Sequence, residues 1–212
     1  MKYVIFFIYF LSVIEVHARP VSYPGGVTLM QMNDGYFSNL HLHYSPSIKN
    51  SIGLKIDNNR VEKWTFVGIQ YNNLLKRINK KKSQANFYLK SAIGSTHSDE
   101  YPFSSYQVPA GFIGFAADWE DRRFFTSYEN KSFYSSDIAK YFQQKVRFGI
   151  APYIGKYGDL HTWIMLQIQH IPKLETEEIN ITPLLRFFKD VYLVESGVSL
   201  DGEIILNAVI RF

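Results

Sequence analysis

The sequence contains no cysteine, which excludes disulfide frameworks, thiolate zinc sites and cysteine nucleophiles. It also lacks a strong charge bias, since the formal net charge is +4 and the only basic run is Lys80 to Lys82. Nucleic-acid binding therefore has little support, because proteins of that class carry a basic patch or stripe. After Ala18, no apolar run approaches the length of a membrane-spanning helix. What remains is one domain or a small pair.

Aromatic residues, by contrast, are abundant at 17%, while charged residues make up 20% of the 212 residues. Neither a disordered chain nor a helical membrane protein has this combination. At the start, Lys2 precedes an apolar run from Tyr3 to Ile14, and Val16-His17-Ala18 resembles a small-residue cleavage site. This pattern predicts a secretory signal peptide over residues 1–18 and a mature domain over residues 19–212.

The last ten residues, from Glu203 to Phe212, alternate with a period of two. Every even position from Ile204 to Phe212 is apolar, and the odd positions include Asn207 and Arg211. Such a segment is a strand with one apolar and one mixed face. It resembles the closing strand of bacterial outer-membrane barrels, so Phe212 and Ile210 are predicted to form a signal that the barrel-assembly machinery reads.

About twelve such segments follow one another, and together they predict an all-β fold. An even count suits a closed, antiparallel, up-and-down transmembrane β-barrel. The expected strands cover Gly26 to Met32, Asn39 to Ser45, Ser51 to Ile56, Trp64 to Asn73, Gln84 to Ile93, Val108 to Trp119, Arg122 to Glu129, Val146 to Ile154, Leu160 to His170, Ile179 to Phe188, Val191 to Leu200 and Glu203 to Phe212.

The expected connections alternate in length, as they do in outer-membrane barrels. Short turns follow the even-numbered strands and long polar loops follow the odd ones. The short turns are Glu120-Asp121, Gly155 to Asp159 and Lys189-Asp190; the long loops are Ser95 to Gln107, Asn130 to Gln144 and Pro172 to Glu178. One connection departs from this rule, because Lys76 to Ser83 is longer than a periplasmic turn should be.

Three hairpin registers follow from these turns. A turn at Glu120-Asp121 pairs Asp118 with Arg123, and one at Lys189-Asp190 pairs Phe187 with Tyr192. A three-residue turn through Asp201-Gly202, with glycine where a positive φ is needed, places Val198 opposite Ile204.

Charged side chains on the mixed faces are expected to line the lumen of the barrel. There they would pair across it and either hold the barrel shut or set the selectivity of a small pore. These predicted lumen charges are Lys55, Lys90, Asp118, Arg123, Glu129, Arg147, Arg186 and Glu195.

Two further groups could carry chemistry. Met30 and Met32 share a face with His41 and His43, and thioethers beside imidazoles suit copper, especially Cu(I). The alternative for this group is that methionine fills gaps and histidine lines a polar lumen. His43 and Ser45 also share a face and could act as base and nucleophile, although Pro46 follows at once and no third, orienting group is evident.

Several stretches resemble a family of uncharacterised proteobacterial envelope proteins, and the resemblance covers nearly all of the mature chain. They are Tyr23 to Gly26, Thr28 to Gly35, His41 to Pro46, Gln84 to Ser91, Ala116 to Glu129, and Ala151 to Gly155. The family looks like outer-membrane barrels and is loosely linked to copper handling. The resemblance implies no activity and assigns no functional residue, but it favours copper as the one cofactor to consider.

The leading hypothesis is therefore a non-enzymatic protein of the cell outer membrane, either structural or a small pore for solutes or metal ions. Its expected partners are outer-membrane lipid and the barrel-assembly machinery. No nucleic-acid partner is expected, and the sequence does not determine the oligomeric state. One alternative is a membrane-embedded lipid hydrolase that uses His43 and Ser45. Another is a soluble periplasmic barrel that binds a ligand.

Overall fold

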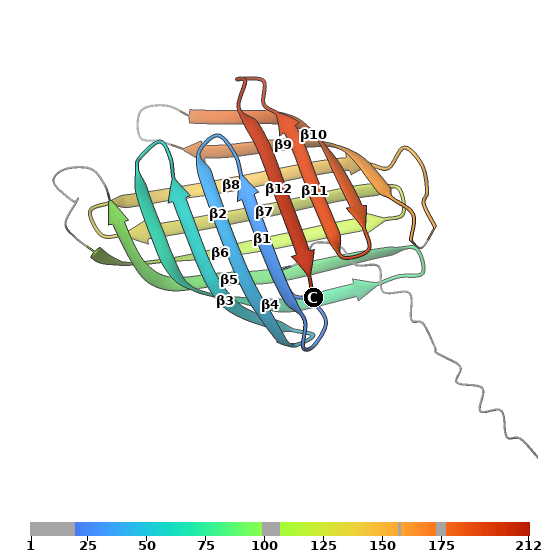
Figure 1. Cartoon of the computed structure of the whole chain (residues 1–212), viewed down its shortest axis with the longest axis horizontal. Coiled ribbons are helices and arrows are strands. Elements are labelled where there is room, and N and C mark those ends of the chain that lie inside the picture. The colour runs from blue at the N-terminus through green and yellow to red at the C-terminus, as the bar shows by residue number, and fades with distance from the viewer. Residues whose placement is uncertain (1–19, 99–106, 157, 173–176) are drawn as a thin grey trace, which may run out of the picture.

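The computed structural model describes residues 20–98, 107–156, 158–172 and 177–212, which form twelve strands (Figure 1). The predicted signal peptide, residues 1–18, lies outside the described residues. The strands are β1 (Val27–Asn33), β2 (Phe37–Ser47), β3 (Asn50–Asn59), β4 (Trp64–Asn79), β5 (Ser83–Ser98), β6 (Gln107–Asp121), β7 (Phe124–Ser135), β8 (Ala139–Ile150), β9 (His161–Pro172), β10 (Glu177–Lys189), β11 (Tyr192–Val198) and β12 (Ile204–Arg211).

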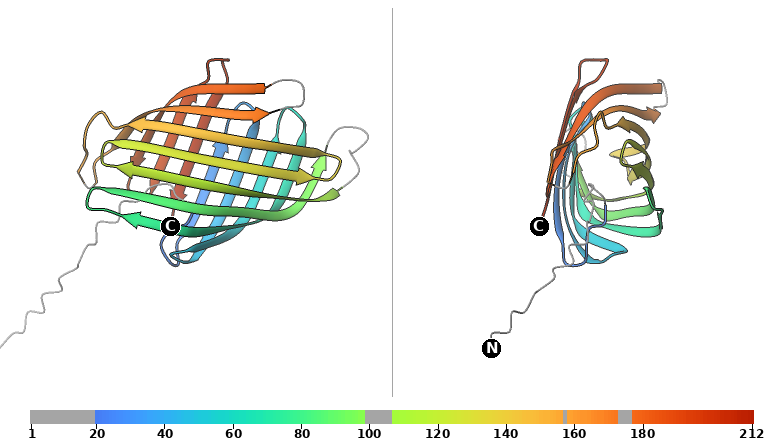
Figure 2. Two further views of the ribbon diagram at one scale, coloured as in Figure 1. Left: turned by 180° about the vertical axis from the view of Figure 1, so that it is seen from behind. Right: turned by 90° about the vertical axis from the view of Figure 1, so that its right-hand side faces the viewer.

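Each strand pairs antiparallel with its neighbours in sequence, and β1 pairs with β12 to close the barrel. This confirms the predicted fold class. Seen from the side, β1–β3, β11 and β12 cross in front of β5–β9 at a steep angle, so the two walls are strongly sheared (Figures 1 and 2). Within the described residues, no helix is long and apolar enough to cross a membrane.

Side chains alternate between the lumen and the outer surface, and the apolar face is the outer one. On β4, buried Phe66 and Gln70 alternate with exposed Val67 and Ile69. Ile93 on the outer surface is 77% exposed, which is far more than a soluble core would leave open. The soluble ligand-binding alternative requires the apolar face to point inward, and the structure places it outward.

Two predicted hairpin registers are wrong, although the faces are right. Asp121 Oδ1 accepts hydrogen bonds from the backbone N–H groups of Arg123 and Phe124 at 2.7 and 2.6 Å, which moves the first turn to Arg122 and Arg123. Asp118 therefore lies opposite Ser127 rather than Arg123. Such an Asx turn follows from a local side-chain bond, not from the strand pattern.

The second turn is centred on Asp190 and Val191, so Lys189 pairs with Tyr192. This two-residue shift places Glu195 opposite Arg186 instead of Leu184. The third register is confirmed, because Val198 lies opposite Ile204 and Gly202 has a φ of 85°.

The predicted contrast between short turns and long loops is also wrong in part. The segment from Asn130 to Gln144 continues β7 and β8 and leaves only Ser136 to Ile138 as the turn. Conversely, the connection from Ala151 to Leu160 is longer than the turn predicted within it. The end of β7 and the start of β8 cannot be recognised in the sequence, because aromatic residues there occupy both inward and outward positions.

The long connection predicted between β4 and β5 is a short turn, Lys80 to Lys82. A register shift between Leu74 and Lys76 interrupts the ladder, and β4 then continues to Asn79. Because such a bulge breaks the period of two, the sequence pattern ends there while the strand does not.

Aromatic side chains fill the lumen at the end where β1 joins β2, which we call the loop end. The ring of Phe133 stacks on Trp64 at a centroid distance of 5.0 Å and on Tyr141 at 5.2 Å. Together with Phe37 and Phe66, these residues form the loop-end cluster, in which Trp64 is 1% and Phe66 0% exposed. The cluster narrows this end of the lumen.

The N-terminal segment before β1 occupies the opposite end, which we call the turn end. Val21 is buried against Leu74, Tyr88 and Ala116. Ser51 Oγ donates to the Pro20 carbonyl at 2.6 Å, which ties the segment to the inner wall. Protein atoms therefore narrow the lumen at both of its ends.

Candidate functional site

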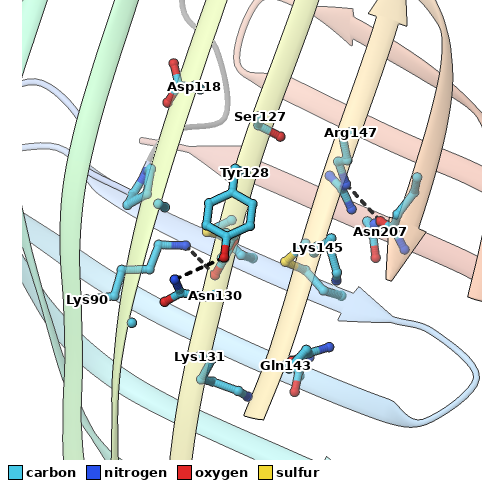
Figure 3. Close-up of a pocket in the computed structure, with 18 of the residues that line it drawn as sticks. Lys90, Asp118, Ser127, Tyr128, Asn130, Lys131, Gln143, Lys145, Arg147 and Asn207 are labelled. Atoms are coloured by element: carbon cyan, nitrogen blue, oxygen red, sulfur yellow. Dashed lines mark hydrogen bonds and ion pairs between the residues drawn. The ribbon is translucent and has the colours of Figure 1, made fainter. Parts of the chain in front are cut away.

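Between the two filled ends lies a cavity of about 220 Å³ inside the barrel. Its wall is polar and charged, with side chains contributed by strands on both sides of the lumen (Figure 3). We call it the lumen chamber. Its charged lining residues are Asp34, Lys55, Lys90, Asp118, Glu120, Glu129, Lys131, Lys145, Arg147 and Arg186.

Ion pairs connect strands that are distant in sequence. Lys90 Nζ on β5 lies 2.7 Å from Glu129 Oε1 on β7. Asp57 on β3 is fully buried and serves two lysines, with Lys55 at 2.7 Å and Lys131 at 3.3 Å. The Lys131–Asp57 pair spans the lumen from β7 to β3, whereas the Lys90–Glu129 pair joins two strands that are separated only by β6.

A second network surrounds Glu195 on β11. Its carboxylate lies 2.7 Å from Arg186 NH2 and 3.3 Å from Arg147 NH1, and it accepts a hydrogen bond from Asn207 Nδ2 at 2.7 Å. Arg147 Nε also donates to Gln167 Oε1 at 2.8 Å. Because Glu195 is only 2% exposed, two guanidinium groups and an amide replace the water that its charge requires.

Seven of the eight predicted lumen charges face inward. Six of them line the chamber, and Glu195 is bound to two of those. Arg123 is the exception and the prediction is wrong for it, because it lies exposed in the turn between β6 and β7. Arg123 was expected within the strand ladder because the turn was predicted at Glu120-Asp121, two residues before its position in the structure.

The sequence pattern did not reveal several other charged residues of the inner wall, among them Asp34, Asp57, Glu120, Lys131 and Lys145. Each lies just outside a predicted strand. Asp57 follows the segment that was expected to end at Ile56, and Lys131 falls in a segment expected to be a loop. Continuing the period of two past the apolar residues would have placed Asp57 and Lys131 on the inner face.

The proposed metal ligands are partly brought together. Met30 lies directly opposite His41 in the β1–β2 ladder, and the rings of His41 and His43 are 4.6 Å apart. Met32 is farther away, opposite Asn39. Within the described residues, no group of three or more His, Cys, Asp or Glu side chains could hold a metal ion.

The His43–Ser45 pair is not arranged as a base and a nucleophile. Both residues face the lumen, at 1% and 0% exposure, and neither ring nitrogen of His43 has a hydrogen-bond partner. Ser45 Oγ instead accepts a hydrogen bond from the backbone N–H of Ser22 at 3.0 Å. General-base activation needs hydrogen-bond contact between the two side chains, which this arrangement lacks.

Phe212 ends beside the first residue of β1. Its N–H donates to the Val27 carbonyl at 2.9 Å, and its side chain is 65% exposed. Ile210 lies opposite Leu29 on the outer side. The role of both residues in assembly stays a prediction.

No protein-family model matches the chain, and no curated protein matches it in sequence. Among solved structures it is similar to OccK8 (OprE) of Pseudomonas aeruginosa, with 6% identity and a TM-score of 0.45 over 83% of this chain and 57% of that one. It is also similar to LpxR from Salmonella typhimurium, with 8% identity and a TM-score of 0.45 over 88% of this chain and 99% of LpxR. The barrel assignment here rests on the strand pairing above.

Proposed function

We propose that the chain is an integral protein of the bacterial outer membrane. The observation that carries this proposal is the inverted barrel, with exposed Ile, Leu, Val and Phe outside and ion pairs inside. In water, a continuous apolar surface of this kind promotes association. In a bilayer, the same surface contacts lipid chains, and the closed strand ladder pairs the backbone groups.

Membrane fractionation of the expressed chain tests the location. The protein should co-sediment with the outer membrane and migrate faster on gels before heating than after it. Recovery in the soluble periplasmic fraction would contradict the proposal.

For the lumen, we propose a closed chamber for small solutes rather than an open diffusion pore. The loop-end cluster supports this, because its buried rings, Trp64 and Phe133 among them, occupy the lumen at that end. In planar bilayers, the wild-type barrel should give no steady conductance. The double variant Trp64→Ala/Phe133→Ala should conduct once the segment before β1, which fills the turn end, is also deleted. Steady conductance by the wild type would overturn the closed-chamber role.

A second candidate use of the lumen is a Cu(I) site formed by Met30, His41 and His43. It is favoured by the contact between the two imidazoles and by Met30 lying opposite His41. His41 Nε2 and both nitrogens of His43 are buried without a hydrogen-bond partner, so they are available to a metal. Neutral, soft donors of this kind suit Cu(I).

Competition with the chromophoric chelator bicinchoninate tests the copper site. The folded barrel should withdraw one equivalent of Cu(I), and Met30→Leu/His41→Leu should abolish this while keeping the fold. Equal withdrawal by a Met32→Leu barrel is expected, because Met32 lies apart. No withdrawal by the wild type would exclude the site.

A further inference from the structure

Four cations gather on one side of the lumen chamber, namely Lys90, Lys131, Lys145 and Arg147, and we call them the basic cluster. Three of them come from adjacent strands. Lys145 on β8 lies directly opposite Glu129 on β7, with Arg147 two residues along its own strand. Lys131 is the next inward-facing residue after Glu129 on β7 and lies opposite Gln143 on β8 (Figure 3). Lys90 reaches the same place from β5 through its contact with Glu129.

The carboxylates near this cluster are already engaged. Glu129 is bound by Lys90 at 2.7 Å, and Asp57 is shared between Lys131 and Lys55. Glu195 is shared between Arg147 and Arg186. Six cations, Lys55, Lys90, Lys131, Lys145, Arg147 and Arg186, form ion pairs with Asp34, Asp57, Glu129 and Glu195, and two further acids, Asp118 and Glu120, line the same cavity at the turn end.

Lys145 has the weakest counterion of the group. Its Nζ lies 3.9 Å from Asp34 Oδ2, which is beyond hydrogen-bond distance. The other oxygen of Asp34 accepts the backbone N–H groups of Tyr36 and Phe37 at 3.0 and 2.7 Å. Asp34 is therefore held in the β1–β2 turn and is not drawn onto Lys145.

There is open space beside Lys145. The side chain of Glu129 is 45% exposed and that of Lys145 is 21% exposed, although both lie inside the barrel wall. Gln143 and Asn207 add amide groups to the lining of the same cavity. Acids at the turn end, Asp118 and Glu120, also line the cavity, and Asp118 is bound by Asn86 at 2.7 Å.

We propose that the lumen chamber binds a phosphate-class anion, with Lys145 as its principal contact and Lys90, Lys131 and Arg147 around it. Such an anion supplies the close counterion that Lys145 lacks, in a low-dielectric space where ion contacts are strong. Its source is either a free phosphate solute or a phosphate carried on a lipid headgroup. This inference goes beyond the proposed membrane role and rests only on the closed barrel.

A lipid could enter where the pairing of the wall is weakest, which is one point of the β6–β7 ladder. The β6–β7 ladder is interrupted where Gly114 and Phe115 face Lys131 and Asn130. There the N–H of Phe115 donates to the side chain of Asn130 at 3.0 Å instead of to the backbone. The cavity borders this part of the wall, because Gly114, Tyr128, Glu129 and Asn130 all contribute atoms to its lining.

Native mass spectrometry of the detergent-folded barrel tests the proposal with three probes: inorganic phosphate, dioleoyl phosphatidic acid and dioleoyl phosphatidylcholine. Phosphate, phosphatidic acid or both should form a saturable one-to-one adduct, and phosphatidylcholine should not. Lys145→Gln should weaken that adduct about tenfold or more, as expected for loss of a charged contact. Lys140→Gln, an exposed site on the same strand, is the matched control and should bind as the wild type does.

A disulfide between Phe115→Cys and Asn130→Cys distinguishes the two sources, because the natural chain has no cysteine. It should block the phosphatidic acid adduct and leave the phosphate adduct unchanged. The proposal is overturned if neither anion binds the wild type, or if Lys145→Gln binds as tightly as Lys140→Gln. Heat-modifiable migration on gels shows whether Lys145→Gln has folded. If it has not, Lys131→Gln is used instead, and the same weakening of the adduct is expected. Outer-membrane fractionation is unaffected by either result, so failure here leaves the membrane role standing.

Discussion

The loop-end cluster and the lumen chamber fill the same barrel interior in two different ways. At the loop end, Trp64, Phe66 and Phe133 pack ring against ring, as in a soluble core. A few residues from Phe133 along β7, Lys131 forms an ion pair across the lumen with Asp57, and Glu129 forms one with Lys90. Apolar packing closes space, whereas paired charges hold the walls at fixed positions and leave room for water or a solute. Structural closure and solute contact are thus divided along the barrel axis.

The largest expected effect comes from removing the shared acid of the charged network. Glu195→Ala leaves Arg147 and Arg186 without their counterion, and it should lower the free energy of unfolding by about 4 kcal/mol. Urea unfolding in lipid vesicles, followed by tryptophan fluorescence, measures this. Asp201→Ala, in an exposed turn, is the control and should change stability by less than about 0.5 kcal/mol. Equal effects would show that the network does not stabilise the barrel.

The aromatic side of the comparison is tested by Phe133→Ala. Removing this buried ring should lower the free energy of unfolding by about 3 kcal/mol, because it leaves a cavity beside Trp64 and Tyr141. Phe142 on β8 points outward and is 39% exposed. Phe142→Ala should lower the free energy of unfolding by less than half as much in the same experiment. A larger loss for Phe142→Ala would show that the outward-facing side chains, and not the inward-facing ones, form the packed core.

A charge on the outer surface should be costly only if that surface meets lipid. Ile93→Arg should destabilise the barrel by about 2–3 kcal/mol in vesicles. Ile154→Arg, in the connection between β8 and β9, is the matched exposed site outside the strands and should cost much less. If both substitutions leave the free energy of unfolding almost unchanged, the outer surface of the barrel contacts water and not lipid.

The smallest effect concerns the turn that presents Phe37 to the loop-end cluster. Asp34→Ala removes the acceptor for two backbone N–H groups and should cost about 1 kcal/mol. Asp34→Asn keeps a side-chain carbonyl at that position and should recover most of the loss. If the two variants unfold alike, the hydrogen bonds of Asp34 do not order the turn.

The sequence pattern predicts the fold because strand periodicity requires only that neighbouring side chains differ. The alternation of Val67 and Ile69 with Gly68 and Gln70 is sufficient to define β4 and its two faces. The pattern fails where a side chain acts on the backbone. Asp121 moves a turn by its hydrogen bonds, and a bulge after Leu74 shifts the register of β4.

The chamber could be predicted only in part for the same reason. Lys90, Glu129 and Arg147 lie within clear alternation, so their inward direction follows from the sequence. Lys131 and Phe133 lie where both faces carry aromatic and polar residues, which conceals the strand. Which carboxylate serves which cation depends on barrel shear, a property of all twelve strands together.

The most direct test of the inverted barrel is a cysteine scan along β9, which the cysteine-free chain allows without background. Ile164→Cys, Met165→Cys, Leu166→Cys and Gln167→Cys are each labelled with an environment-sensitive nitrobenzoxadiazole probe in vesicles. The account predicts blue-shifted emission, quenched by nitroxide-labelled lipids, at positions 164 and 166 and not at 165 and 167. Quenching at 165 and 167 instead, or no alternation at all, would contradict it.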